Sequence, residues 1–293
     1  MSELRKRMIG ELRLRNRSES TIESYVRYAY RLAKYYRTSP DLLSVEQIRA
    51  FLLHLVVDRG QSPATVNVAL NALVFLYRDV LGWDMEGKLK SLQRPRIRES
   101  LPKAYSQDET YRILHDGCLG PDKRQMFLMM LYSTGMRLSE ACGLRWGHVE
   151  LDRDMLRIDR GKGGKDRYVP LSRLLRERFH AGSVRRKPGD AVFASHHSGG
   201  AKPISPATGR RYYNLAVERC GVDRKGGPHC LRHSYAVHQL ERGVDINTLR
   251  VLLGHKSLQT TMIYLRVTKS RIEQVGTPLE ELYIRAGEKR RQS

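Results

Sequence analysis

The sequence predicts a mainly α-helical protein with a small antiparallel sheet in its second half. Apolar residues recur at helical spacing along residues 1–92, which is typical of packed amphipathic helices. Residues 155–159 and 167–171 have the pattern of short strands, and the glycine-rich stretch between them favours a hairpin turn. A charged stretch with two prolines, residues 93–106, separates the two regions. We therefore expect a helical domain over 1–92, a linker over 93–106 and a mixed α+β domain over 107–293.

Serine residues mark two helix starts in the first region. Ser44 precedes a run with its apolar residues on one face, and Ser62 precedes Pro63, which is favoured in the first turn of a helix. About four helices are expected here. The apolar side chains expected in their shared core are Tyr25, Tyr28, Leu32, Ile48, Phe51, Leu52, Leu55, Val66, Leu70, Leu73, Val74 and Tyr77.

The second region is expected to mix helices with strands. An apolar helix over 126–132 ends at Gly135, and Ser205 starts another helix that runs to about Cys220. A third strand is expected at 191–193, where three apolar residues follow one another. The remaining expected helices span residues 231–242, 246–253 and 260–267, with a last one from Thr277.

The charge balance points to a polyanionic partner. The chain has 53 Lys and Arg residues against 31 Asp and Glu residues, which gives a formal net charge of +22. Basic side chains bind nucleic acids because they neutralise phosphates and release counterions. Nucleic acid is therefore the expected partner, although a ribosome-associated or simply basic protein has the same charge.

Composition argues against secretion, membrane insertion and metal binding. The four cysteines are scattered, with neither a CxxC pair nor zinc-like spacing, as in a reducing compartment. The N-terminus is too charged for a signal peptide, and no apolar run reaches the roughly 20 residues that span a bilayer. There is no GxxxxGK[ST] loop and no obvious acidic metal-binding cluster. We expect a cytoplasmic protein without membrane association, cofactor or metal.

Two local patterns carry candidate anion-binding residues. Arg137 follows Gly135 at the expected start of a helix, where a guanidinium can face a phosphate. Glu140 lies three residues further on, close enough to hold that guanidinium in place. Lys162 lies in the glycine-rich turn, with Lys165 as a nearby competitor. Taken alone each pattern is weak, because Arg–Glu pairs and lysines in turns are common at protein surfaces.

Two further patterns lie nearer the C-terminus. His229 and Arg232 are three residues apart, so an imidazole that can move a proton and a guanidinium that can hold an anion face one site. Gly254 is expected to end a helix, which leaves His255 in the following turn. Tyr264 lies nine residues after that histidine, on the next expected helix. Each pattern recurs by chance, whereas the order of all of them along one chain is very unlikely to do so.

The combined order of Arg, Lys, His-x-x-Arg, His and Tyr resembles that of the tyrosine recombinase (phage integrase) family. The resemblance rests on the motifs TGMRLSE, GKGGKDRYVPL, HCLRH, LLGH and TTMIY. It extends to residues 1–92, which look like the helical, SAM-like core-binding domain of that family. In size and layout the chain looks closest to compact Xer-type recombinases or mobile-element integrases.

The resemblance implies an enzyme that cleaves and rejoins DNA strands at specific sites through a 3′-phosphotyrosine bond, with neither metal nor ATP. Tyr264 would attack the DNA phosphate, while Arg137 and Arg232 would clamp the non-bridging oxygens. A free tyrosine has a pKa near ~10, so attack at neutral pH needs a base and a cationic site.

The resemblance also assigns three supporting roles. Lys162 would protonate the departing 5′-oxygen, His229 would act as general base toward Tyr264, and His255 would add a hydrogen bond to the phosphate. The implied partner is double-stranded DNA, held by a homo- or hetero-tetramer on two DNA sites, with or without a partner recombinase or accessory protein. Residues 278–283 could form a helix that docks on a neighbouring subunit, or a basic tail.

Three alternatives fit the sequence less well. A type IB topoisomerase would use nearly the same chemistry, but the helical first region and the length favour a recombinase. A DNA-binding protein that has lost catalysis would lack one of the catalytic residues, and none is missing. A basic RNA-binding or ribosomal protein would explain the charge but not the ordered motifs.

Overall fold

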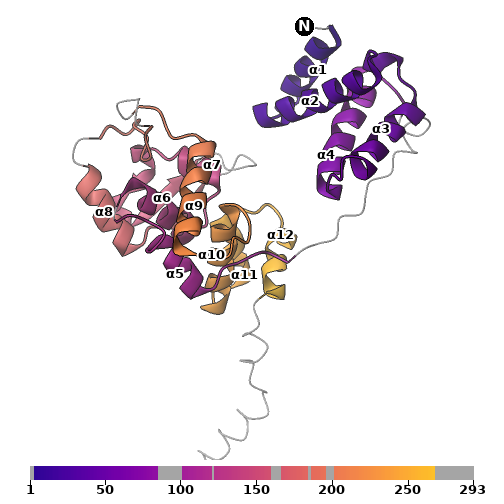
Figure 1. Cartoon of the computed structure of the whole chain (residues 1–293). Coiled ribbons are helices and arrows are strands. Elements are labelled where there is room, and N and C mark those ends of the chain that lie inside the picture. Colours follow the sequence, from indigo (N-terminus) through magenta and orange to yellow (C-terminus); the bar gives the residue numbers. More distant parts are fainter. Residues whose placement is uncertain are drawn as a thin grey trace, which may run out of the picture. The chain divides into compact units, whose positions relative to one another are not determined.

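The chain divides into two units, residues 1–99 and 100–293, each with its own hydrophobic core (Figure 1). A computed structural model describes residues 3–84, 101–120, 122–159, 166–183, 186–195 and 201–267. Within these ranges no helix is both long and apolar enough to cross a membrane.

The first unit is built from helices. Its main elements are α1 (Glu3–Leu14), α2 (Glu19–Tyr36), α3 (Val45–Val57) and α4 (Pro63–Val74), with a 3-10 turn at Pro40–Leu42 and a π-helical turn at Phe75–Val80. Ser44 caps α3 through a capping box with Gln47, and the Ser62 hydroxyl accepts a hydrogen bond from the Thr65 amide at the start of α4. Both helix starts expected from the sequence are confirmed.

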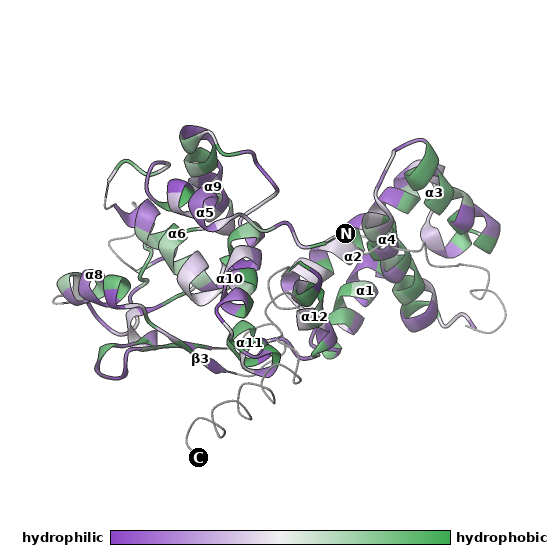
Figure 2. Cartoon of the chain, turned by 90° about the horizontal axis from the view of Figure 1, so that it is seen from below, coloured by the Kyte–Doolittle hydropathy of each residue, from purple (hydrophilic) through white to green (hydrophobic). Residues whose placement is uncertain are grey.

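The core of the first unit lies between these helices. The apolar positions expected there are buried, except Tyr25 and Val74, which are half-buried against the same cluster. The buried Tyr77 hydroxyl donates to the Pro40 carbonyl oxygen, 2.6 Å away, so its polar atom is satisfied. Hydrophilic and apolar positions alternate along the helices (Figure 2), as amphipathic helices around a common core require.

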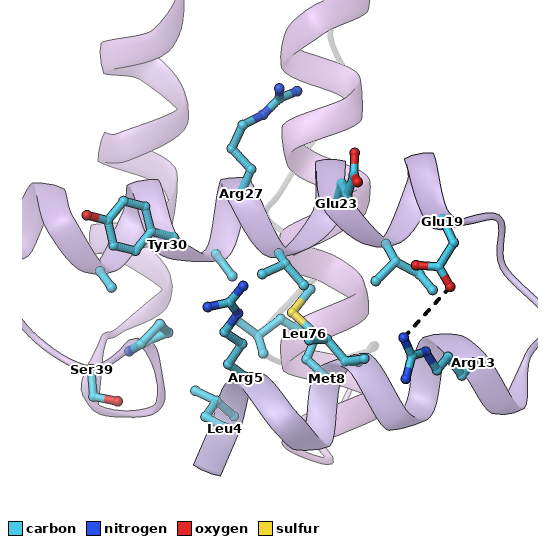
Figure 3. Close-up of a pocket in the computed structure, with 16 residues that line it drawn as sticks. Leu4, Arg5, Met8, Arg13, Glu19, Glu23, Arg27, Tyr30, Ser39 and Leu76 are labelled. Carbon is cyan, nitrogen blue, oxygen red and sulfur yellow. Dashed lines mark ion pairs between the residues drawn. The ribbon is translucent and has the colours of Figure 1, made fainter. Parts of the chain in front are cut away.

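A groove of about 600 Å³ runs between α1 and α2 (Figure 3). Met8 and Leu76 line its apolar part, and the side chain of Arg5 extends from α1 towards α2 (Figure 3). Arg13 forms an exposed ion pair with Glu19 across one end of the groove, with 3.8 Å between nitrogen and oxygen. The groove therefore combines an apolar floor with charged residues of both signs at its rim.

The second unit mixes helices with one small sheet. Its helices are α5 (Gln107–Leu114), α6 (Lys123–Thr134), α7 (Leu138–Cys142), α8 (Arg173–Ser183), α9 (Pro206–Cys220), α10 (His229–Glu241), α11 (Ile246–Leu253) and α12 (Gln259–Met262). Short 3-10 turns occur at Trp146–His148, Leu151–Arg153 and Ile263–Arg266. The strands β1 (Val149–Glu150), β2 (Met155–Ile158) and β3 (Arg167–Pro170) pair antiparallel in that order. The mainly helical fold with a small antiparallel sheet is confirmed.

The third strand was placed wrongly from the sequence. Residues 191–193 form no strand, and Ala191 makes only an isolated bridge with Arg145. These residues are buried in the core instead, where the ring of Phe193 packs edge-on against Phe127 with 5.0 Å between centroids. The third strand is β1, which is too short to show the alternating pattern that identifies a strand.

Two expected helices differ in their bounds. The helix expected over 231–242 begins earlier, at His229. The helix expected over 260–267 is a four-residue α-helix followed by the 3-10 turn that carries Tyr264. The glycine-rich turn with Lys162, and the segment from Thr277, lie outside the described residues.

Helices α6 and α10 pack side by side in the second unit (Figure 1). Most of α10 is buried, including the charged side chain of Arg232. Gly135 ends α6 in the left-handed conformation, with φ of +61°. A Cβ atom there would lie 2.5 Å from the ring of Tyr235 and 2.9 Å from Leu253. Only glycine therefore satisfies both the backbone and the space at the turn that leads to Arg137.

We expect Gly135→Ala to lower the free energy of unfolding of the second unit by about 3 kcal/mol. Roughly 1–2 kcal/mol comes from the left-handed backbone and 1–3 kcal/mol from the overpacked side chains. Urea unfolding of the full chain, with hydrogen exchange in α10 to locate the change, measures the loss.

Gly221→Ala is the matched control. Gly221 ends α9 with φ of +63°, but the nearest atom to its added Cβ, on Arg112, is 4.0 Å away. Equal losses in the two variants would show that the packing against Tyr235 contributes nothing.

Candidate active site

Arg137 is anchored at the N-terminus of α7 by Glu140. The backbone amide of Arg137 donates to Glu140 Oε2 at 2.8 Å, and its Nη1 donates to Glu140 Oε1 at 2.7 Å. Nη2 lies 3.4 Å from the carbonyl oxygen of Gly254. The sequence-based expectation that Glu140 holds the guanidinium of Arg137 agrees with this geometry.

A second arginine, which the sequence analysis missed, shares the same carboxylate. Arg167 Nη2 donates to Glu140 Oε2 at 2.7 Å, and Nη1 donates to Oε1 at 3.1 Å. Its Nε donates to the Leu252 carbonyl oxygen at 2.9 Å. The alternation of inward and outward positions along β3 could have identified Arg167, because it lies on the same buried face as Val169. An arginine at an inward-facing strand position needs an internal partner.

Glu140 is therefore an ionised carboxylate enclosed by two arginines. Burial acts to raise its pKa, but the hydrogen bonds and charges of Arg167 and Arg137 outweigh burial and lower the pKa to about 2. The side chain is only 7% exposed, so its charge is poorly screened by water.

Arg232 lies on α10 and reaches the ends of two other helices. Its Nη1 donates to the Gly135 carbonyl oxygen at 2.5 Å, and its Nη2 donates to the Leu253 carbonyl oxygen at 2.7 Å. Burial, followed by the positive charge of Arg137, lowers its pKa to about 10. The guanidinium is still charged at neutral pH, and the backbone carbonyls at the C-terminal ends of α6 and α11 fix its direction.

His255 follows Gly254 and joins this network. Arg232 Nη2 donates to His255 Nε2 at 2.9 Å, so that nitrogen accepts, and His255 Nδ1 lies 2.9 Å from the Thr261 hydroxyl. Burial, followed by the charge of Arg232, lowers the pKa of His255 to about 4. The imidazole is therefore neutral, with its proton on Nδ1 and directed to Thr261.

Tyr264 lies in the 3-10 turn after α12 and is 2% exposed. Its hydroxyl is 3.0 Å from His233 Nδ1. Burial raises the pKa of Tyr264, although the charges of Arg232 and Arg137 act in the opposite direction. The phenol is therefore enclosed, protonated and within the electrostatic reach of both arginines.

The histidine in contact with Tyr264 is His233 and not His229. His229 is exposed at the start of α10, one turn away, with 6.5 Å between the two ring centroids. Protein atoms around its ring, followed by the charges of Arg232 and Arg137, lower the pKa of His229. His233 was within the motif HCLRH, and its position four residues after His229 on one helical face was the available signal.

The assembled residues form a cluster with an excess of positive charge. Arg137, Arg167 and Arg232 against the single carboxylate of Glu140 give a formal net charge of +2. Arginine suits a permanent phosphate site because it stays charged and donates several hydrogen bonds in one plane. Among the residues that the structure describes, no group of His, Cys, Asp or Glu is arranged to hold a metal ion.

Known proteins are similar to this sequence over both units. Residues 105–271 match the phage integrase family, and residues 4–86 match the N-terminal SAM-like domain of phage integrases. The chain belongs to the phage integrase family of tyrosine recombinases. The tyrosine recombinase XerA of Pyrococcus furiosus is 31% identical over 278 residues, which cover 93% of this chain and 92% of the relative. XerA of Thermococcus kodakarensis is 34% identical over 261 residues, 88% of each chain.

Solved structures of recombinases share the fold. A dimer of λ integrase residues 75–356 bound to a COC′ core site superposes with a TM-score of 0.70 at 18% identity, covering 94% of this recombinase and 98% of that chain. XerH in a post-cleavage complex with palindromic difH superposes with a TM-score of 0.69 at 22% identity, covering 91% of this recombinase and 82% of that chain. Site-specific recombination, by cleavage and rejoining of DNA strands, is accordingly the activity of the recombinase, and DNA is its partner.

The lowered pKa of Glu140 gives a pH dependence with a defined sign. Because folding lowers this pKa from 4.5 to about 2, the ionised carboxylate stabilises the folded recombinase above pH 4.5, and this contribution is lost as the pH falls towards 2. We expect the second unit to lose about 3 kcal/mol from this group across that window. Urea unfolding between pH 7 and pH 2.5 measures it.

Glu140→Gln should be less stable at pH 7 and should lose less stability on acidification, since its amide does not titrate. Glu218→Gln, an exposed position on α9, is the control and should follow the wild type. Parallel pH curves for wild type and Glu140→Gln would contradict the assignment.

Proposed function

We propose that Tyr264 is the nucleophile of this recombinase. Its oxygen would bond to the phosphorus of a DNA strand while the bond from phosphorus to the 5′-oxygen breaks, leaving a 3′-phosphotyrosine and a free 5′-hydroxyl. A 5′-hydroxyl from a partner strand would then reverse the step. The observation that carries this proposal is the position of Tyr264 beside the arginine cluster: burial raises the pKa of its phenol, and the charges of Arg232 and Arg137 oppose that rise.

Arg137 and Arg232 would hold the non-bridging oxygens of the attacked phosphate. Both guanidiniums are oriented before any ligand binds, Arg137 by Glu140 and Arg232 by two backbone carbonyl oxygens. Donors that are fixed in advance stabilise the extra negative charge of the transition state without a cost for reorganisation.

His255 would add a hydrogen bond to the phosphate. In the structure its Nε2 accepts from Arg232, so donation to a phosphate oxygen requires the proton to move from Nδ1 to Nε2. Thr261 permits this exchange, because a hydroxyl that accepts from Nδ1–H can equally donate to a bare Nδ1. The arrangement supports a tautomer change that needs no change of charge.

His229 would act as the general base toward Tyr264, and Lys162 as the general acid toward the 5′-oxygen. The pKa of His229 is lowered, so its ring is neutral at physiological pH and able to accept a proton. Its exposure at the start of α10 leaves it open to a phenol that has moved towards bound DNA.

We further propose the organisation in which these residues act. Residues 1–92 would form the core-binding domain, 93–106 the linker and 107–293 the catalytic domain, with a homo- or hetero-tetramer assembled on two double-stranded DNA sites. The match of residues 4–86 to the SAM-like domain of integrases supports the first assignment. We place the enzyme in the cytoplasm, acting without metal or ATP in chromosome-dimer resolution or in movement of a mobile element.

A nicked suicide DNA tests the nucleophile. Candidate target sites from the flanking genome carry a nick beside the expected scissile phosphate, so that a short fragment diffuses away after cleavage and traps the adduct. We expect wild type to form a protein–DNA adduct that survives SDS, and Tyr264→Phe to form none while still binding DNA.

Tyr235→Phe is the matched control for this experiment, because Tyr235 is also a buried tyrosine of the second unit. It should keep the adduct. Adduct formation by Tyr264→Phe would place the nucleophile on another residue.

The proposed acid role of Lys162 can be tested by changing the leaving group of the DNA. Lys162→Ala should slow cleavage of ordinary DNA by about 100-fold or more, the usual effect of removing a general acid. A substrate with sulfur in place of the bridging 5′-oxygen should restore the rate, since a thiolate leaves without a proton. Lys165→Ala is the control and should cleave both substrates like wild type. Equal defects of Lys162→Ala on both substrates would contradict the acid role.

A further inference from the structure

The hydroxyl of Tyr264 is in a place from which it cannot attack DNA. The residue is 2% exposed, whereas an attacking oxygen must touch the phosphorus of a bulky DNA strand. Attack therefore requires Tyr264 to leave the position it has in this structure.

Thr261 and Tyr264 make polar contacts that attach their segment to the rest of the second unit, and Ile263 packs against the same apolar cluster as Tyr264. Across residues 259–266, Thr261 and Tyr264 are the buried positions, while Met262 and Leu265 are exposed. Thr261 is bonded to His255, and Tyr264 to His233. The segment is short, with four α-helical residues and a 3-10 turn, so the loss of one of these contacts makes its release from the second unit easier.

The bond between Tyr264 and His233 joins two uncharged groups. Burial, followed by the influence of His229 and Arg232, lowers the pKa of His233 to about 4, so the imidazole is neutral. Its Nδ1 can then accept a hydrogen bond from the phenolic hydroxyl, which is 3.0 Å away. The ring planes are inclined by 49° with 5.7 Å between centroids, so the hydroxyl bond and not ring stacking aligns the pair.

We propose that His233 is a positioning residue that holds Tyr264 in this enclosed place until DNA binds. The inference rests on the proposed role of Tyr264 as the nucleophile. His233 and His229 lie one turn apart on the same face of α10, and one helical turn rises about 5.4 Å. Movement of the phenol by one turn towards the exposed N-terminus of α10 transfers it from His233, which holds it, to His229, which takes its proton.

How strongly His233 holds Tyr264 in the enclosed position can be measured without DNA, from the rate at which N-acetylimidazole acetylates Tyr264. Trypsin releases Tyr264 within residues 257–266 and Tyr235 within residues 233–242, so mass spectrometry follows both tyrosines separately. His233→Ala removes the acceptor of a bond whose net contribution is about 1 kcal/mol, which corresponds to a fivefold change in population. We therefore expect Tyr264 to be acetylated about fivefold faster in His233→Ala than in wild type.

His233→Asn is the conservative variant. The Oδ1 of asparagine occupies nearly the place of Nδ1 and accepts the same proton, so acetylation of Tyr264 should return towards the wild-type rate. Tyr235, buried on α10 in the same cluster, reports on the packing around the pair and should keep its low reactivity in both variants.

The same proteins are then compared on the nicked suicide DNA. His233→Ala should form the adduct at least as fast as wild type, because it removes a contact that attack must break. Unchanged acetylation of Tyr264, faster acetylation of Tyr235 as well, or a slower adduct would each overturn the proposal, the last by making His233 a participant in the reaction. Adduct formation by Tyr264→Phe would instead refute Tyr264 as the nucleophile, while the acetylation result would still show whether His233 holds Tyr264.

Discussion

The site depends on one buried carboxylate. Glu140 accepts hydrogen bonds from the side chain and the backbone amide of Arg137, and from both terminal guanidinium nitrogens of Arg167. Without this negative charge, two arginines would face each other in a poorly screened space, each repelling the other. The carboxylate also connects the turn before α7 to β3, so the same interaction that neutralises the arginines joins two parts of the fold.

Backbone carbonyl groups at helix ends also position the arginines of the site. The last carbonyl groups of a helix have no partner within the helix, and they carry partial negative charge. Arg232 and Arg167 use carbonyl oxygens at the C-terminal ends of α6 and α11, which both end at a glycine with positive φ. These glycines let the chain turn away so that the carbonyl groups remain open to the arginines.

The sequence predicted what depends on local rules. Serine caps, the helix ends at Gly135 and Gly254, and the two strands beside the glycine-rich turn follow from the preferences of a few neighbouring residues. The third strand was missed because a two-residue strand has no periodicity to detect, and the apolar run at 191–193 packs in the core without pairing. The resemblance to a family supplied the candidate residues Arg137, Arg232, His255 and Tyr264, which the structure brings near one another.

The parts of the site that sequence reasoning missed are those set by contacts between distant segments. Arg167 reaches Glu140 from β3, which packs beside α11, and 27 residues separate the pair along the chain. His233 differs from His229 only by its place one turn deeper along α10, and no motif states which of the two touches Tyr264. Spacing along a helix predicts the face on which a residue lies, but it does not predict how far that residue is buried in the domain.

The neutrality of His233 and His255 has a consequence for the electrostatic character of the enzyme. Both histidines have a pKa of about 4, and Arg232 keeps its proton up to a pKa of about 10. Between those limits these three groups neither gain nor lose charge. The attraction of these groups for a DNA backbone therefore stays constant across that pH range, and ionic strength is the main solution variable that changes it.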